Sequence, residues 1–262
     1  MGDAPATGVG IRLGEVVASI ATRALAALAA GVLVLGFGGR LVMYLSRLLH
    51  PGALGALTEG GNRVGDFTVG GTVGLVFFGG LFNGLLVALV WVVVEPWIPK
   101  RPVAVGTAAA MIGSFSLIVS ENIDFVVLRD PYFDVVLLIG LVFAMGVALV
   151  YFDRWLEGRL PDPADSTGWK VTSWVIVALG ATVFFGPLRV FFSEDFCFCE
   201  EPPVATGVLL VIVGLATLWS WVNRVRGEAN PPALDRWAPI AVWAAVVAGA
   251  IHLGREIVQI FV

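Results

Sequence analysis

The feature that most constrains this chain is a series of uncharged apolar stretches, each close to the length of a membrane crossing. A helix that crosses a hydrocarbon core of about 30 Å needs about 20 mainly apolar residues. Seven stretches meet that requirement, so residues 1–262 are predicted to form a single transmembrane helical domain. The predicted spans are about 18–48, 69–94, 103–120, 135–155, 170–190, 204–223 and 237–260.

Composition excludes most other classes of protein. Charged residues make up only 14% of the chain and hydrophobic residues 58%, whereas about a quarter of a soluble domain is charged. Backbone groups in lipid must be hydrogen-bonded within the protein, and no segment alternates with a period of two. The predicted fold class is therefore all-α, a polytopic helical bundle. A net charge of −4 without any basic run argues against a nucleic-acid partner.

The basic residues predict an orientation. Seven spans put the termini on opposite sides, and the side of the N-terminus then holds ten of the 16 Lys and Arg residues. The positive-inside rule places that side in the cytoplasm and the C-terminus outside, with a cell (plasma or inner) membrane as the location. The ten residues are Arg12, Arg23, Lys100, Arg101, Arg154, Arg159, Lys170, Arg224, Arg226 and Arg236.

A polar cluster is predicted at the outer ends of the helices. Three arginines end outward-running spans there, and each needs a partner because an arginine at the bilayer centre costs about 2.5–3.5 kcal/mol. One interpretation is a site for an anion or an amphiphilic headgroup. The alternative, which we favour, is that these arginines reach lipid phosphates or lock helices through ion pairs. The candidate residues are Arg40, Arg189, Arg255, Glu121, Asp124 and Glu256.

His252 adds a titratable group to that cluster. It precedes Glu256 by four residues, so the two side chains share one face of the last span. The pair could relay protons or bind a metal, although a packing role for the histidine is favoured.

Cys197 and Cys199 are the two cysteines of the chain and lie in a predicted outer loop. Residues i and i+2 of an extended backbone project to the same side, so a disulfide or a soft-metal site is open to them. Two cysteines fall short of the four ligands of a structural zinc site. We predict no cofactor.

Glycine-rich stretches predict close helix packing. The spacings Gly70-xxx-Gly74 and Gly80-xxx-Gly84 allow neighbouring backbones to approach. The alternative is a flexible helix beside a permeation path, with Asn83 as its polar group.

Three runs carry a resemblance to known sequences. Gly39-Arg40-Leu41-Val42-Met43, the stretch from Glu59 to Thr68 and the stretch from Asp124 to Pro131 together resemble a group of uncharacterised bacterial multi-pass membrane proteins. The resemblance covers the first four predicted spans and implies no activity.

Catalytic motifs such as HExxH, GxSxG and aspartate-rich Mg²⁺-diphosphate motifs are absent from the sequence. Few polar residues lie inside the spans, which weakens the case for a hydrophilic pathway. We therefore predict a non-catalytic subunit or scaffold of a membrane complex, or a lipid- or amphiphile-interacting protein, with membrane lipids and other membrane subunits as partners. A small-solute or ion transporter that uses the outer arginine and carboxylate site is the alternative. A membrane enzyme acting on a lipid-like substrate comes last.

Overall fold

The structure, a computed structural model, describes residues 7–57, 68–120, 125, 131–162, 165–183, 189–194 and 201–262. The regular structure in those residues is helical, with 84% helix and no strands. The all-α fold class is therefore confirmed for the described part of the chain.

Five helices in the described residues are long and apolar enough to cross a membrane. The shortest has 23 residues, which at 1.5 Å per residue is about 34 Å and exceeds the hydrocarbon thickness of about 30 Å. These features identify an integral membrane protein. The five helices are Arg12–Leu49, Val69–Trp97, Tyr132–Glu157, Val204–Arg226 and Pro232–Phe261.

Three of the five are single α-helices, and two are divided into segments of different helical type. Arg12–Leu49 lies within α1 (Thr7–Ala30), the π-helix η1 (Gly31–Gly38) and α2 (Gly39–Leu49). Val69–Trp97 comprises α3 (Val69–Gly74), the π-helix η3 (Leu75–Phe82), α4 (Asn83–Val94) and the 3₁₀ turn η4 (Glu95–Trp97). The undivided helices are α7 (Tyr132–Glu157), α11 (Val204–Arg226) and α12 (Pro232–Phe261).

The span predicted at 103–120 is a shorter helix in the structure. α5 (Pro102–Gly113) gives way to the 3₁₀ turn η5 (Ser114–Ser116). The Ser116 hydroxyl donates to the carbonyl of Gly113 (2.8 Å), a local bond of the kind that competes with continued α-helix. The apolar run is therefore long enough to span, but its Gly-Ser-Phe-Ser sequence ends the α-helix early.

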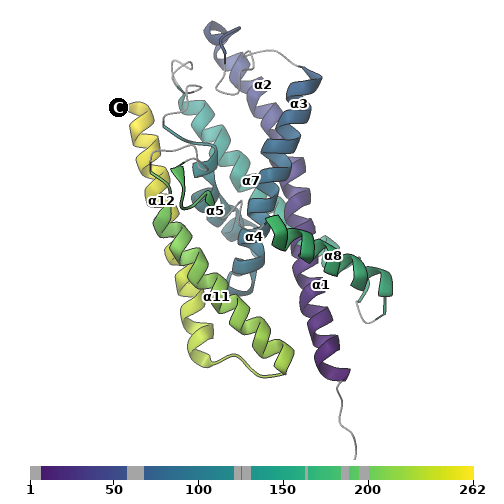
Figure 1. Cartoon of the computed structure of the whole chain (residues 1–262). Helices are drawn as coiled ribbons and strands as arrows, with labels where there is room; N and C mark the ends of the chain where they lie inside the picture. Colours follow the sequence, from purple (N-terminus) through teal and green to yellow (C-terminus); the bar gives the residue numbers. More distant parts are fainter. Residues whose placement is uncertain are drawn as a thin grey trace, which may run out of the picture.

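The span predicted at 170–190 is described only up to residue 183 and again from residue 189. Its described part, α8 (Thr167–Val183), has 17 residues and lies obliquely against α1 (Figure 1). Trp169 and Ser173 form its buried side, while Trp174 and Leu179 are exposed. Five of the seven predicted spans thus correspond to membrane-length helices in the described residues.

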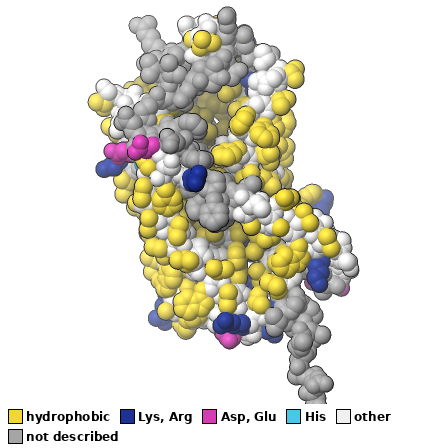
Figure 2. Space-filling view, in the orientation of Figure 1, with side chains coloured by type: hydrophobic (Ala, Val, Ile, Leu, Met, Phe, Trp, Pro, Cys, Tyr) yellow, Lys and Arg dark blue, Asp and Glu magenta, His cyan; other side chains and the backbone are white. Residues whose placement is uncertain are grey.

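The bundle has two ends, which charged contacts and chain direction define. In Figure 1 the start of α1, the end of α4 and the turn between α11 and α12 lie at the lower end. We call this the basal end, and the opposite one, which holds α2 and the C-terminus, the upper end. Figure 2 shows hydrophobic side chains across the middle of the face in view and basic side chains at its lower edge, as expected of a surface that meets lipid.

Glycines allow the two π-helical segments to pack closely against each other. A Cβ atom at Gly31 would lie 2.6 Å from the Cα of Gly84, and one at Gly80 would lie 3.0 Å from the Cα of Val32. The close packing predicted for Gly80-xxx-Gly84 is confirmed. Gly70-xxx-Gly74 makes no such contact in the described part of the chain, where no atom lies within 4 Å of a Cβ built at either residue.

We predict that Gly31→Ala lowers the melting temperature of the purified protein. The added methyl meets backbone atoms that cannot turn aside, and overpacking of this kind costs about 1–3 kcal/mol of unfolding free energy. Gly74→Ala is the matched control, since its methyl enters open space. Thermal melts in one detergent would compare them, and equal melting temperatures for the two variants would contradict the packing described.

Candidate functional site

A cluster of five charged side chains lies inside the basal end of the bundle. The Arg23 guanidinium of α1 pairs with Glu95 of η4, with 2.6 Å between Nη2 and Oε2. The Lys100 ammonium then contacts three carboxylates: Glu95 Oε1 at 2.8 Å, Asp153 Oδ2 at 2.8 Å and Glu157 Oε1 at 2.7 Å. We call this set the basal charge cluster. It joins α1, the end of α4 and the end of α7.

Burial explains why these charges are paired. Arg23 is 8% exposed and Asp153 is 0% exposed. A lone charge at such a depth carries a desolvation penalty of several kcal/mol, which only close opposite charges and hydrogen bonds offset. Asp153 Oδ1 and Arg23 Nε are buried without a hydrogen-bond partner among the described residues. The cluster is therefore held together by a few direct contacts, with little redundancy.

Lys100 is the centre of the cluster and lies outside the membrane-length helices. Burial alone would lower its pKa, but the hydrogen bonds to Asp153, Glu157 and Glu95 and the charge of Glu95 outweigh that effect and raise the pKa above its usual 10.5. The folded state therefore favours the ammonium form. Its stabilising contribution is present below the unfolded pKa and is lost only as the pH rises through the higher folded value.

The three carboxylates also form a candidate metal-binding group. One oxygen from each of Glu95, Asp153 and Glu157 lies within 4.8 Å of the others, and carboxylate oxygens suit hard divalent cations. In this structure the Lys100 ammonium lies among them and bonds to one oxygen of each. The side chain of Lys100 thus supplies the positive charge that the group needs.

Among the predicted outer residues, Arg40 connects two consecutive helices. Its Nε donates to Thr72 Oγ1 (3.0 Å) and its Nη2 to the carbonyl of Thr68 (3.0 Å). Thr68 also caps α3, accepting a hydrogen bond from the Gly71 N–H through Oγ1. The contacts of Arg40 therefore fix the start of α3 against α2.

His252 and Glu256 lie together on α12. Their Nε2 and Oε1 atoms are 3.9 Å apart, and the buried Glu256 accepts a hydrogen bond from the Ser120 N–H through Oε2 (2.8 Å). The His252 ring meets Phe115 edge to face, with 6.1 Å between centroids. Glu256 thus ties the segment after η5 to α12.

The other candidates from the sequence lie elsewhere. Arg255 reaches Glu201 at the surface, 3.6 Å away, and Arg189 is an exposed residue at the start of the short segment 189–194. Arg40, the His252–Glu256 pair and Arg255 therefore each have a different partner in these contacts. Glu121, Asp124, Cys197 and Cys199 lie outside the described residues.

A further pair joins helices at the upper end. His50, which ends α2, contacts Asp134 in the first turn of α7, with 2.7 Å between Nε2 and Oδ2. Both side chains are largely buried. This pair connects the first and third membrane-length helices at the end opposite the basal charge cluster.

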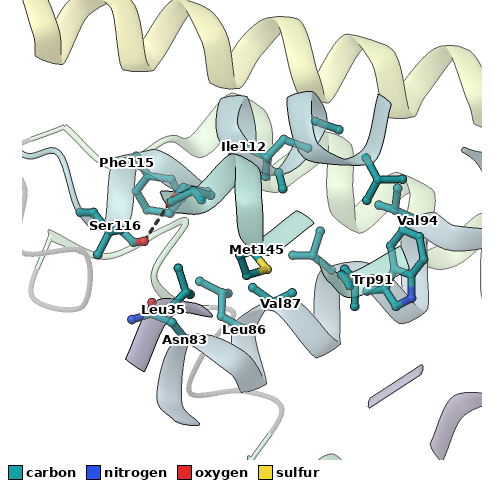
Figure 3. A pocket seen from close by; sticks show the side chains of 18 of the residues that line it. Leu35, Asn83, Leu86, Val87, Trp91, Val94, Ile112, Phe115, Ser116 and Met145 are labelled. Atoms are coloured by element: carbon teal, nitrogen blue, oxygen red, sulfur yellow. Dashed lines mark hydrogen bonds between the residues drawn. The ribbon is translucent and has the colours of Figure 1, made fainter. Parts of the chain in front are cut away.

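An apolar cavity lies inside the bundle, between α4, α5 and α7 (Figure 3). About 710 Å³ of space between atoms lies within its outline, and this figure includes space that is open to the surroundings. Residues spaced by three and four along α4 form one wall, and Met145 of α7 and Ile112 of α5 face them across it. The α4 wall consists of Leu86, Val87, Val90, Trp91 and Val94.

Two polar residues of the cavity are already engaged, whereas the buried indole N–H of Trp91 has no hydrogen-bond partner among the described residues. Asn83 donates through Nδ2 to the carbonyls of Phe78 (3.3 Å) and Gly79 (3.2 Å). Ser116 uses its hydroxyl proton on Gly113, as described above. The cavity therefore presents almost only carbon to a guest, and such cavities stay dry.

The cavity extends over about half of the bilayer. Its α4 wall runs from Asn83 to Val94, which at 1.5 Å per residue is about 16 Å. Asn83 lies at the middle of the Val69–Trp97 helix, and Val94 lies at its basal end. The long axis therefore matches one leaflet of a hydrocarbon core about 30 Å thick.

Comparisons of the chain with protein-family models, with curated proteins and with solved structures find no match.

Sequence reasoning missed both the basal charge cluster and the cavity. It treated Arg23 and Lys100 only as markers of orientation and did not assign roles to Glu95 or Asp153. A usable signal was present, since Glu95 and Asp153 end long apolar stretches on the same side as these two basic residues. The cavity depends on the distances between three helices, and the hydropathy pattern of a single helix does not indicate those distances.

We predict that Lys100→Met destabilises the fold. Removing the ammonium leaves the fully buried Asp153 without its partner, and breaking a buried ion pair costs about 3–5 kcal/mol of unfolding free energy. Adding Asp153→Asn to Lys100→Met should recover part of that loss, because the uncompensated charge is gone. Thermal or denaturant melts in detergent would measure both effects.

Lys170→Met is the matched control, because Lys170 lies exposed on α8. It should leave the melt almost unchanged. A Lys100→Met protein as stable as wild type would show that the basal charge cluster contributes nothing to stability.

Proposed function

We propose that this membrane protein binds the hydrocarbon part of an amphiphilic molecule in the cavity between α4, α5 and α7. The observation that carries the proposal is the cavity itself, which is apolar, lies within the bundle and spans the depth of one leaflet. A role as a non-catalytic lipid- or amphiphile-interacting protein follows.

Physical chemistry favours an occupied cavity. Atoms that line an empty space lose the dispersion contacts they would make in a packed core, and this costs stability. A hydrocarbon chain restores those contacts without stranding any polar group. Lipid tails surround a membrane protein at high concentration, so they are the natural source of such a chain.

The same lining weighs against transport of a hydrophilic solute or ion. A desolvated polar guest would need hydrogen-bonding partners, and Asn83 and Ser116 already use their donors on backbone carbonyls. Of the outer residues that the transport hypothesis needs in one site, Arg40 contacts Thr72, Glu256 lies beside His252, and Arg255 lies near Glu201.

A second candidate function, as a subunit of a larger membrane complex, is favoured by α8. This helix has only a narrow buried side against α1 and leaves Val171, Trp174, Val175 and Leu179 exposed. Such a face meets either lipid or another transmembrane protein. A stoichiometric protein partner that survives extraction in mild detergent would support the subunit.

We predict that Ala109→Phe abolishes binding of a hydrocarbon chain. Ala109 lines the cavity on α5, so a benzyl group in its place would fill space that the guest needs. Native mass spectrometry of the detergent-purified protein, with dioleoylphosphatidylcholine added, would show the bound lipid in wild type and its loss in the variant.

Ala178→Phe makes the same change on the exposed side of α8 and should keep the lipid. Melting temperatures of both variants would show that they remain folded. Undiminished lipid binding by a folded Ala109→Phe protein would contradict the proposal.

We further propose seven spans in a bacterial plasma or inner membrane, with the basal end in the cytoplasm. The excess of basic residues on that side supports the orientation. Cys197 and Cys199, which lie outside the described residues, are then extracytoplasmic. A membrane-impermeant thiol reagent should label them from outside intact cells, after reduction if they are disulfide-bonded, and labelling only in inverted vesicles would refute this topology.

A further inference from the structure

We infer that the guest of the cavity is an anionic phospholipid of the basal leaflet, with its phosphate bound by Arg101 and Arg154. The inference rests on the proposed function, since it requires a chain in the cavity. The arginines specify the charge and the position of the lipid headgroup, neither of which the apolar lining of the cavity determines.

The cavity ends one helical turn from the basal loop. Val105 lines it on α5 and follows Arg101 by four residues, while Leu149 lines it on α7 and precedes Asp153 by four. Residues four apart lie above one another on the same helix face. A chain that fills the cavity therefore ends beside the basal charge cluster and the loop that contains Lys100.

Two arginines belong to the segments that come together at that position. Arg154 donates through Nη2 to the backbone carbonyl of Lys100, and Arg101 is the next residue. Both arginines are exposed. Neither forms an ion pair with a carboxylate in the described part of the chain, because Glu95, Asp153 and Glu157 bind Arg23 and Lys100 instead.

This division of charge makes the loop complementary to an anion. The basal charge cluster uses its carboxylates internally, so the surface beside it presents the positive charge of Arg101 and Arg154. Guanidinium groups bind phosphate oxygens through paired hydrogen bonds. Arg23 and Lys100 are unsuited to this role, since their charges are committed to buried carboxylates.

Trp155 indicates that the two arginines lie at headgroup depth. It follows Arg154 on α7, is exposed, and stacks beneath the Arg159 guanidinium with 4.5 Å from Cζ to the ring centroid. Exposed tryptophans and arginines of this kind concentrate where the hydrocarbon meets water. A phosphate at Arg101 and Arg154 would thus lie at the level of the other lipid headgroups while its chain fills the cavity.

The experiment compares two lipids with the same tails. Native mass spectrometry of the purified full-length protein would be titrated with dioleoylphosphatidylglycerol and with dioleoylphosphatidylcholine. Wild type should prefer the anionic lipid. The double variant Arg101→Gln/Arg154→Gln should bind phosphatidylglycerol roughly ten- to thirty-fold more weakly, given the attraction of each basic residue to anionic lipid, and should retain phosphatidylcholine.

Arg224→Gln/Arg226→Gln is the matched control, because it removes two exposed arginines from the basal end of α11. It should keep the preference. An unchanged preference in Arg101→Gln/Arg154→Gln would overturn the inference and leave the proposed function standing. Displacement of the lipid by millimolar inorganic phosphate would also overturn it, since the cavity would then contribute nothing. Failure of wild type to bind either lipid would defeat the proposed function itself.

Discussion

The contact of one lysine ammonium with three carboxylates sets the arrangement of the basal half of this protein. Lys100 lies in a loop, yet Glu95 and Asp153 meet it from the ends of two membrane-length helices, and Arg23 binds Glu95 from a third. Because Asp153 is fully buried, the helices cannot shift here without leaving its charge unpaired in a site shielded from water. The spacing of α1, α4 and α7 follows from that constraint.

The apolar cavity is compatible with this arrangement because the charged side chains and the apolar cavity wall lie at different depths along the helices. The charges lie at the membrane surface, and the wall from Asn83 to Val94 lies above them. The other side of the Val69–Trp97 helix packs closely, because Gly80 and Gly84 approach η1 and α1 there. One helix thus combines a tight glycine-lined contact with an open face, and the space for a guest results from that difference.

Much of the fold follows from the sequence, since length and hydropathy alone indicate five of the membrane-length helices. The early end of the α-helix in the span at 103–120 has a local cause, because the Ser116 hydroxyl gives the chain after Gly113 an alternative to continued α-helix. The span at 170–190 is described only in part, and its described part, α8, lies obliquely against α1. We grouped Arg40, Arg255 and Glu256 because they have similar predicted depths in the membrane. Depth does not specify on which side of the bundle each helix lies. The basal charge cluster was missed because its members come from three separate stretches of sequence.

The buried position of Arg23 also has a consequence for synthesis in the membrane. Glu95 is made 72 residues later (95 minus 23), so the first hydrophobic helix leaves the ribosome carrying a guanidinium whose partner does not yet exist. Because the basal charge cluster lies at the membrane surface, this guanidinium can remain solvated until Glu95 is in place. The ion pair is formed and buried only when the second membrane-length helix packs against the first. Arg23 thus links the burial of a charge to a step that follows synthesis of the second helix.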